Sequence, residues 1–308
     1  MNIYQKREVL KMLLEFKCSN HRSIKEEVNF SMIAGSDNTS EGLLKEFGKF
    51  RVLRSAVIYG ANGSGKSNFI SALLFMCDLV SNSINYQPGQ GIFQVRHKLS
   101  AEDSSSRYSI QFVRNDIRYA YGFSVKQNLI QDEYLYYFPK GRQVKIFERD
   151  RLEIRPGDRY KGVFDVSVSI LKDNRLFLSC AANYSNVKEI EEAFLFFKTD
   201  IVIYNPEINN WTEYSIKLMQ DNDMMKKIFL NILRALGTGA KDVKVKLEKI
   251  KLADLPQELP LPDALKSLLG TKEGNRIEAK VIYDQFEVDL MTEESTGVKR
   301  LFQMICPI

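Results

Sequence analysis

The chain has 308 residues, of which 44% are hydrophobic and 11% aromatic, with only 17 Gly and 8 Pro. This composition excludes disordered and collagen-like proteins, and the length predicts two compact units or one domain with a large insertion. The 44 basic and 39 acidic residues leave a net charge of +5, which permits anionic partners without requiring them.

No apolar run approaches the ~18 residues that cross a bilayer, and the first residues are of mixed charge. We therefore expect a cytoplasmic protein without a membrane partner. The four cysteines (Cys18, Cys77, Cys180 and Cys306) lie far apart without a C-x-x-C pair, which predicts buried reduced thiols and not a zinc site. With only two histidines, a histidine-rich metal centre is excluded.

Three short strands are expected before residue 60, at 13–18, 27–32 and 52–59, because each carries a short apolar and β-branched pattern. From Ser67 onward apolar residues recur at helical spacing until the Pro- and Gly-containing stretch 85–91. A strand, a turn and a helix are therefore predicted in succession.

The pattern changes to a period of two between Ile117 and Val125, where aromatic and aliphatic residues alternate with polar or small ones. Such alternation is typical of a half-buried strand. Polar turns separate it from similar segments on either side, which predicts an antiparallel meander over about 108–155. We expect its aromatic stripe to be core and not a base-stacking platform.

Helical segments are expected at 187–198 and 223–236, the second closed by Gly237 as a C-cap. Strand patterns return at 276–283 and 286–290. The expected division is a nucleotide-binding head with a phosphate loop and the β meander (1–159), a mainly helical insertion (160–275) and a return to the head (276–308).

The most specific motif is Gly60-Ala61-Asn62-Gly63-Ser64-Gly65-Lys66-Ser67, a full match to G-x-x-x-x-G-K-[ST]. Its glycines let the backbone N–H groups wrap an oxyanion at the start of a helix, as in P-loop NTPases. Lys66 is the expected catalytic cation on the β- and γ-phosphates, and the Ser67 hydroxyl is the expected Mg²⁺ ligand. Main-chain donors come from the remaining loop residues (Gly60, Asn62, Gly63, Ser64 and Gly65). ATP and Mg²⁺ are thus the predicted cofactors.

The order of motifs around this loop resembles the RecF/SMC/OLD-like branch of ABC ATPases. In that branch an N-F-[RK]-S element precedes G-x-N-G-x-G-K-S-N, and this chain has Asn20-His21-Arg22-Ser23 before the loop and Asn68 directly after it. His21 stands where the family usually has Phe. The resemblance implies that Arg22 contacts nucleotide phosphate and that Asn68 belongs to the nucleotide site; a solvated loop arginine is the alternative for Arg22.

Near the end, Glu294-Ser295-Thr296-Gly297-Val298 resembles the S-x-G signature that opens a helix in this branch. In the family the signature engages a γ-phosphate bound by another subunit, so the resemblance implies that Ser295 and Gly297 bind nucleotide in a homodimer or higher homo-oligomer. An ordinary helix cap is the alternative. The whole layout is similar to bacterial OLD-like and abortive-infection ATPases that act in phage defence, which implies an effector partner such as a nuclease or toxin.

The match to an ABC head fails after the signature, where an apolar strand should end in Asp-Glu, the carboxylates that hold Mg²⁺ and activate water. Asp284 precedes the signature and is interpreted as a strand end, and no motif singles out either Gln94 or Gln111 as the Q-loop glutamine. The expected fold class is therefore α/β, a P-loop NTPase of the ABC-ATPase head type that is C-terminally incomplete, with turnover left open.

Two other functions remain alternatives at this stage: a DNA-repair or recombination ATPase of the RecF/SMC type, and a nucleotide-sensing scaffold without turnover. Nucleic acid is a possible partner because the stretch 241–251 carries five lysines, although a solvated strand or helix face explains them as well.

Overall fold

The computed structural model describes residues 10–35, 41–203, 211–251 and 273–305. The chain forms two compact units, Met1–Ile201 and Val202–Ile308. This division differs from the boundaries expected near 160 and 275. Helices after residue 160 share the core of the first unit, and a strand of the expected insertion pairs with one beyond residue 273.

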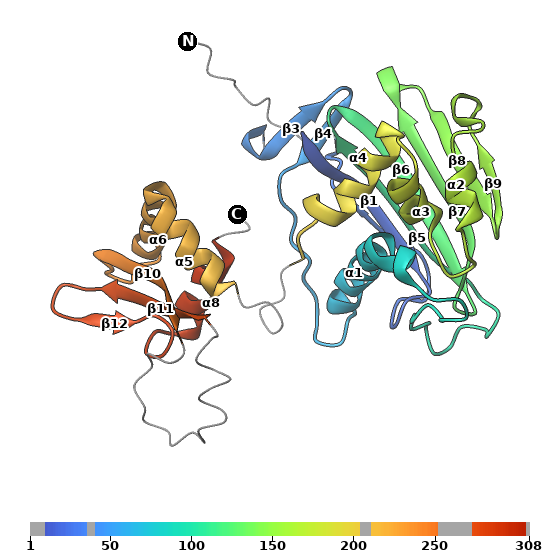
Figure 1. Cartoon of the computed structure of the whole chain (residues 1–308). Coiled ribbons are helices and arrows are strands. Elements are labelled where there is room, and N and C mark those ends of the chain that lie inside the picture. The colour runs from blue at the N-terminus through green and yellow to red at the C-terminus, as the bar shows by residue number, and fades with distance from the viewer. Residues whose placement is uncertain (1–9, 36–40, 204–210, 252–272, 306–308) are drawn as a thin grey trace, which may run out of the picture. The chain divides into compact units, whose positions relative to one another are not determined.

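The first unit is built on a seven-stranded sheet with the order β2-β1-β5-β6-β7-β8-β9, in which each pairing is antiparallel (Figure 1). The meander expected from the alternating pattern is confirmed as β5 to β9. The strands are β1 Lys11–Ser19, β2 Val28–Ser31, β5 Ser106–Arg114, β6 Ile117–Lys126, β7 Leu129–Phe138, β8 Val144–Asp150 and β9 Glu153–Pro156.

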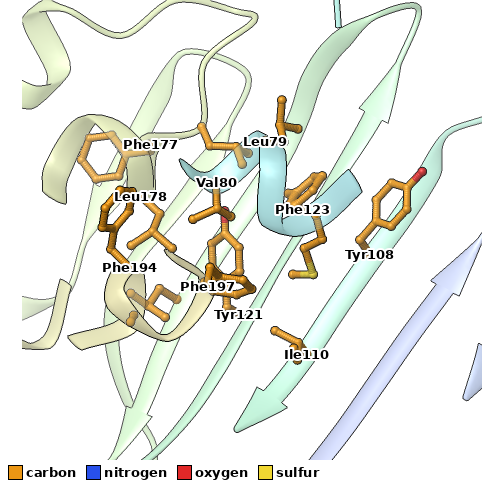
Figure 2. Close-up of a cluster of buried hydrophobic side chains, with 14 of the residues drawn as sticks. Leu79, Val80, Tyr108, Ile110, Tyr121, Phe123, Phe177, Leu178, Phe194 and Phe197 are labelled. Carbon is orange, nitrogen blue, oxygen red and sulfur yellow. The ribbon is translucent and has the colours of Figure 1, made fainter. Parts of the chain in front are cut away.

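Helices cover one face of this sheet and bury its aromatic stripe (Figure 1). They are α1 Lys66–Asn82, α2 Asp165–Ser169, α3 Phe177–Tyr184 and α4 Lys188–Leu195, with a π-helical turn at Phe196–Asp200. Figure 2 shows Leu79 and Val80 of α1 packed among Tyr121, Phe123 and Phe197. The stripe is core, as the alternation predicted.

Short 3-10 turns connect these elements at Glu41–Leu43, Ser83–Asn85, Pro139–Gly141 and Asp158–Tyr160. Cys18, Cys77 and Cys180 are buried free thiols, and burial raises the pKa of Cys18 to about 11 and those of the other two to about 12. Their thiolates are therefore scarce at neutral pH, as expected of inert core cysteines. Cys306 lies outside the described residues.

The strand expected at 52–59 is only partly correct. A hairpin of β3 Leu44–Phe47 and β4 Phe50–Leu53 ends seven residues before Gly60, and residues 54–65 are neither helix nor strand. Val57 and Tyr59 are 84% and 90% exposed. A strand needs a hydrogen-bonded neighbouring strand, and within the described residues no strand pairs with residues 54–59. An apolar sequence alone was therefore not enough to make this segment a strand.

The second unit is a three-stranded antiparallel sheet with helices. Its elements are α5 Thr212–Asp221, α6 Asp223–Ala235, β10 Asp242–Lys251, β11 Glu273–Ile282, β12 Glu287–Asp289 and α8 Thr296–Met304. Gly237 follows α6 with φ of 73°, which confirms the expected cap. A long strand, β10, lies where a helical insertion was expected.

One helical segment in the described residues, Lys66–Asn85, is long and apolar enough to cross a membrane by length and composition alone. The sequence pattern predicted no such run. This segment contains α1, whose Ala72, Met76, Leu79 and Val80 are buried in the core of the first unit. Packing of this kind is ordinary for a core helix.

Candidate functional site

The predicted phosphate loop has the backbone geometry that its glycines suggest. Gly63 and Gly65 have φ of 80° and 95°, which L side chains rarely adopt. A Cβ at Gly60 would lie 2.9 Å from the Ser64 Oγ, and a Cβ at Gly65 would lie 3.0 Å from the Ser23 Oγ. Both the backbone conformation of Gly65 and the nearby Ser23 hydroxyl therefore favour glycine at this position.

Helix α1 begins directly at the loop without a side-chain cap, and its first turn contains no acidic residue. Among the described residues, the backbone N–H groups of Gly65, Lys66 and Ser67 have no hydrogen-bond acceptor. These donors and the partial positive charge of the helix N-terminus make an anion cradle. The loop thus fits a phosphate group, with the exposed Ser67 hydroxyl beside it.

Lys66 folds back over this loop. Its Nζ donates to the carbonyl oxygens of Gly60 and Ala61, at 2.7 and 2.8 Å. The ammonium therefore already lies at the loop, where an incoming phosphate can take over its hydrogen bonds. Ser64 closes the turn through its N–H to the Ala61 carbonyl, at 3.2 Å.

The turn that carries Arg22 lies against the phosphate loop. Asn68 Nδ2 donates to the Ser23 Oγ at 2.7 Å, and that same oxygen faces Gly65. Arg22 itself is exposed, has φ of 51° and donates its N–H to the Val95 carbonyl at 2.8 Å. Sequence reasoning named Arg22 and Asn68 but missed Ser23, the residue that joins them.

His21 anchors this turn to the core. Its Nδ1 lies 2.9 Å from the Tyr108 hydroxyl and its Nε2 2.8 Å from the Ser71 Oγ, so strand β5 and helix α1 hold the imidazole from both sides. Burial, assisted by the neighbouring Arg22 charge, lowers the pKa of His21 to about 4. The ring is therefore neutral at pH 7 and acts in positioning.

An apolar hollow of about 250 Å³ opens beside the loop. It is lined by residues of the loop and α1, by Ile58 and Tyr59 ahead of the loop, and by β2 with its preceding turn. Phe30 of β2 packs against Phe69 of α1, with 5.5 Å between ring centroids. A planar apolar group would fit against these rings, and sequence reasoning did not single out this wall.

Ser295 and Gly297 lie in the second unit, and the structure describes each unit by itself. Ser295 is the N-cap of α8, where its Oγ accepts the Val298 N–H at 3.3 Å. Gly297 has no positive φ, and a Cβ there would meet the Ser295 Oγ only at 3.9 Å. The geometry is that of the helix cap named as the alternative, and a helix start with this cap also presents N–H groups to an anion.

Carboxylates that could hold a metal do not gather in the described residues, where no group of three or more His, Cys, Asp or Glu has that arrangement. Asp284 lies in an exposed turn after β11, paired with Lys241 at 3.2 Å. Gln94 donates to the Asn20 carbonyl at 3.2 Å and Gln111 to Glu15 at 2.9 Å, so both amides have structural partners.

Comparison with known proteins supports the assignment of the loop. Residues 55–161 match the model of a family described as "AAA domain, putative AbiEii toxin, Type IV TA system". The match covers about a third of the chain and includes the phosphate loop, α1 and the meander, which supports an AAA/ABC-type P-loop ATPase. No curated protein matches the chain.

Proposed function

We propose that this chain binds ATP with Mg²⁺ at Gly60–Ser67, hydrolyses it as an ABC-type ATPase, and uses the nucleotide to control an effector such as a nuclease or toxin in antiphage defence. The observation that carries the nucleotide part is the uncapped start of α1 behind a left-handed glycine loop, with Lys66 lying across it. The family match supports a link to toxin–antitoxin or abortive-infection systems. The cytoplasm is the proposed compartment.

In this proposal each residue has a separate role. Lys66 neutralises charge on the β- and γ-phosphates, Ser67 would hold Mg²⁺, and Arg22 reaches a phosphate from the adjacent turn. Mg²⁺ supplies charge neutralisation between phosphate oxygens when it is bound. Asn68 and Ser23 keep the Arg22 turn against the loop through their hydrogen bond.

The test is to measure ATP binding and phosphate release separately with the purified chain. Lys66→Ala removes an ammonium from a half-buried loop position outside the core, so we expect the fold to remain while ATP affinity falls at least tenfold, about 1.4 kcal/mol. Lys188→Ala, which removes an exposed lysine from α4, is the matched control and should bind as the parent does. Equal ATP binding by Lys66→Ala and the parent would overturn the assignment.

We also propose that nucleotide joins two copies, with Ser295 and Gly297 of one copy on the γ-phosphate held by the other. Light scattering with and without ATP and Mg²⁺ tests this. We expect a dimer only with nucleotide, lost in Ser295→Arg. A chain that binds ATP but stays monomeric at saturation would contradict it.

A nucleotide-sensing scaffold without turnover is the second candidate, favoured by the lack of a metal-holding carboxylate group in the described residues. ATP binding without phosphate release by the purified chain supports the scaffold. Phosphate release that disappears in Lys66→Ala supports the ATPase.

A further inference from the structure

A second cavity lies in the first unit, formed by the β3–β4 hairpin and the ends of the meander strands. It has a volume of about 520 Å³, within the range of ligand-binding pockets. Its lining residues are Phe47, Gly48, Lys49, Phe50, Asp116, Arg118, Phe138, Lys140, Gly141 and Arg142. None of them belongs to the phosphate loop or to the turn of Arg22.

The lining combines aromatic rings with a planar cation. The Arg118 guanidinium of β6 lies 3.6 Å from the centroid of Phe138 and 5.2 Å from that of Phe50. Lys49 lies over the Phe50 ring at 5.6 Å. Arg118, Phe50 and Phe138 are all half-buried and line the cavity, so these planar groups border the space in which a base would stack.

The cavity is also strongly basic. Lys49, Lys140 and Arg142 are exposed on two different turns, and Asp116 is the one acidic residue of the lining. Within the described part of the chain, no carboxylate forms an ion pair with Lys49, Arg118, Lys140 or Arg142. Three exposed cations are thus available to an anionic ligand, and the half-buried Arg118, which donates to the Gln111 side chain, adds a fourth positive charge.

The lysines first considered for nucleic acid are different. Lys241, Lys244 and Lys246 pair with Asp284, Glu287 and Glu248. Neighbouring carboxylates therefore compensate these charges, as expected of a solvated strand. The cavity beside Phe138 is therefore a better candidate for anion binding than the lysines of β10.

We propose that this cavity binds a segment of single-stranded nucleic acid. Bases would stack on Arg118 and the phenylalanine rings, while Lys49, Lys140 and Arg142 contact the phosphates. A strand fits better than a free mononucleotide because the cations stand on two separate turns and a strand carries one phosphate per nucleotide. A duplex hides its bases from such a surface.

The experiment measures binding of a labelled oligothymidine of about 20 nucleotides to the full chain by fluorescence anisotropy, without ATP. Between about 50 and about 200 mM salt we expect the parent's affinity to fall roughly twentyfold, because about three phosphate contacts give a slope near −2. Lys49→Glu with Arg142→Glu should weaken binding at least tenfold and flatten this slope. Lys172→Glu with Lys188→Glu makes the same charge change at exposed positions elsewhere in the first unit and should match the parent.

Arg118→Lys separates stacking from charge. It keeps the cation but loses the planar group, so we expect weaker binding with an unchanged salt slope. Photo-crosslinks from thiothymidine should map to the peptides that contain Phe50 or Phe138.

Four outcomes would overturn the proposal: no binding by the parent, equal weakening in the lysine control pair, crosslinks confined to other peptides, or competition by thymidine monophosphate or duplex DNA as strong as by the single strand. Binding that survives in Lys66→Ala would show that the strand does not occupy the phosphate loop, so the two sites are tested independently.

Discussion

At the residue scale, the backbone conformation of Gly65 bears directly on the proposed binding of phosphate. Its φ of 95° opposes a side chain, and so does the Ser23 Oγ, which lies 3.0 Å from where a Cβ would be. We expect Gly65→Ala to push Ser23 from Asn68 and to weaken ATP binding by about 1–3 kcal/mol, the usual cost of such strain. Isothermal titration with ATP measures this.

Gly42→Ala is the control for Gly65→Ala, because a Cβ at Gly42 meets nothing within 4 Å and its φ is not positive. It should bind ATP as the parent does. If Gly65→Ala also binds normally, the loop does not hold the phosphate in the conformation described.

His21 gives a prediction for pH at the same scale. Its pKa is lowered from 6.5 to about 4 in the folded chain, so the unfolded chain takes up a proton first as the pH falls. The neutral His21 therefore contributes its full stabilisation to the folded state above pH 6.5. This contribution is lost between pH 6.5 and about 4, and the total loss in the free energy of unfolding is at most about 3 kcal/mol.

Urea unfolding at several pH values checks this, with His21→Phe as the comparison. The phenylalanine cannot titrate, so its stability should depend less on pH across this window, although it loses the bonds to Tyr108 and Ser71. Equal pH dependence in the two proteins would contradict the role of His21.

At the scale of elements, helix α3 is fixed to the sheet by a buried ion pair. Glu133 of β7 accepts the N–H groups of Phe177 and Leu178, at 2.6 and 2.8 Å, and contacts Arg149 at 3.2 Å. Burial raises the pKa of Glu133, while Arg149 and these hydrogen bonds oppose the rise. The carboxylate thus caps the helix and neutralises a buried guanidinium.

Glu133→Gln leaves Arg149 buried without a counter-charge, so we expect a loss of about 3–5 kcal/mol in the free energy of unfolding. Glu153→Gln breaks an exposed pair with Arg155 and should change stability little. The urea midpoints of the two variants and the parent measure the difference. Similar midpoints for Glu133→Gln and the parent would show that this pair does not hold α3.

Elements with a regular pattern of apolar side chains along one face were predictable from the sequence. Helix α1 and the meander follow from apolar spacing, because one face of each is buried in the same core. The strand expected at 52–59 formed only as far as Leu53, because an apolar run becomes a strand only where a neighbouring strand pairs with it. β10 was missed because its alternating lysines and apolar residues were grouped with helices before it.

The candidate site also has a part that the local sequence predicts and a part that depends on tertiary packing. Gly60–Ser67 could be predicted as a phosphate loop because local spacing alone defines that motif. The position of Arg22 next to it came from family resemblance, and the contact through Ser23 is set by tertiary packing across 45 residues of sequence. The cavity at Arg118 is lined by residues of three hairpins (β3–β4, β5–β6 and β7–β8), and no local sequence pattern predicts that they meet.

At the scale of the whole molecule, each unit has its own buried core. The core of the first includes residues of the sheet, α1, α3 and α4, and that of the second includes Phe229, Val281 and Phe302. The predicted phosphate loop, the Arg22 turn and the apolar hollow beside the loop all lie in the first unit. The proposed signature lies in the second.

This division predicts that residues 1–201 fold alone and bind ATP as the full chain does, because the described groups that contact the loop are present. The same fragment should stay monomeric with ATP, since it lacks Ser295 and Gly297. Circular dichroism during urea unfolding, ATP titration and light scattering test the three statements. A fragment that unfolds without a cooperative transition would show that its sheet needs the second unit. A fragment that still dimerises on ATP would remove the signature from the interface while leaving the phosphate loop in place.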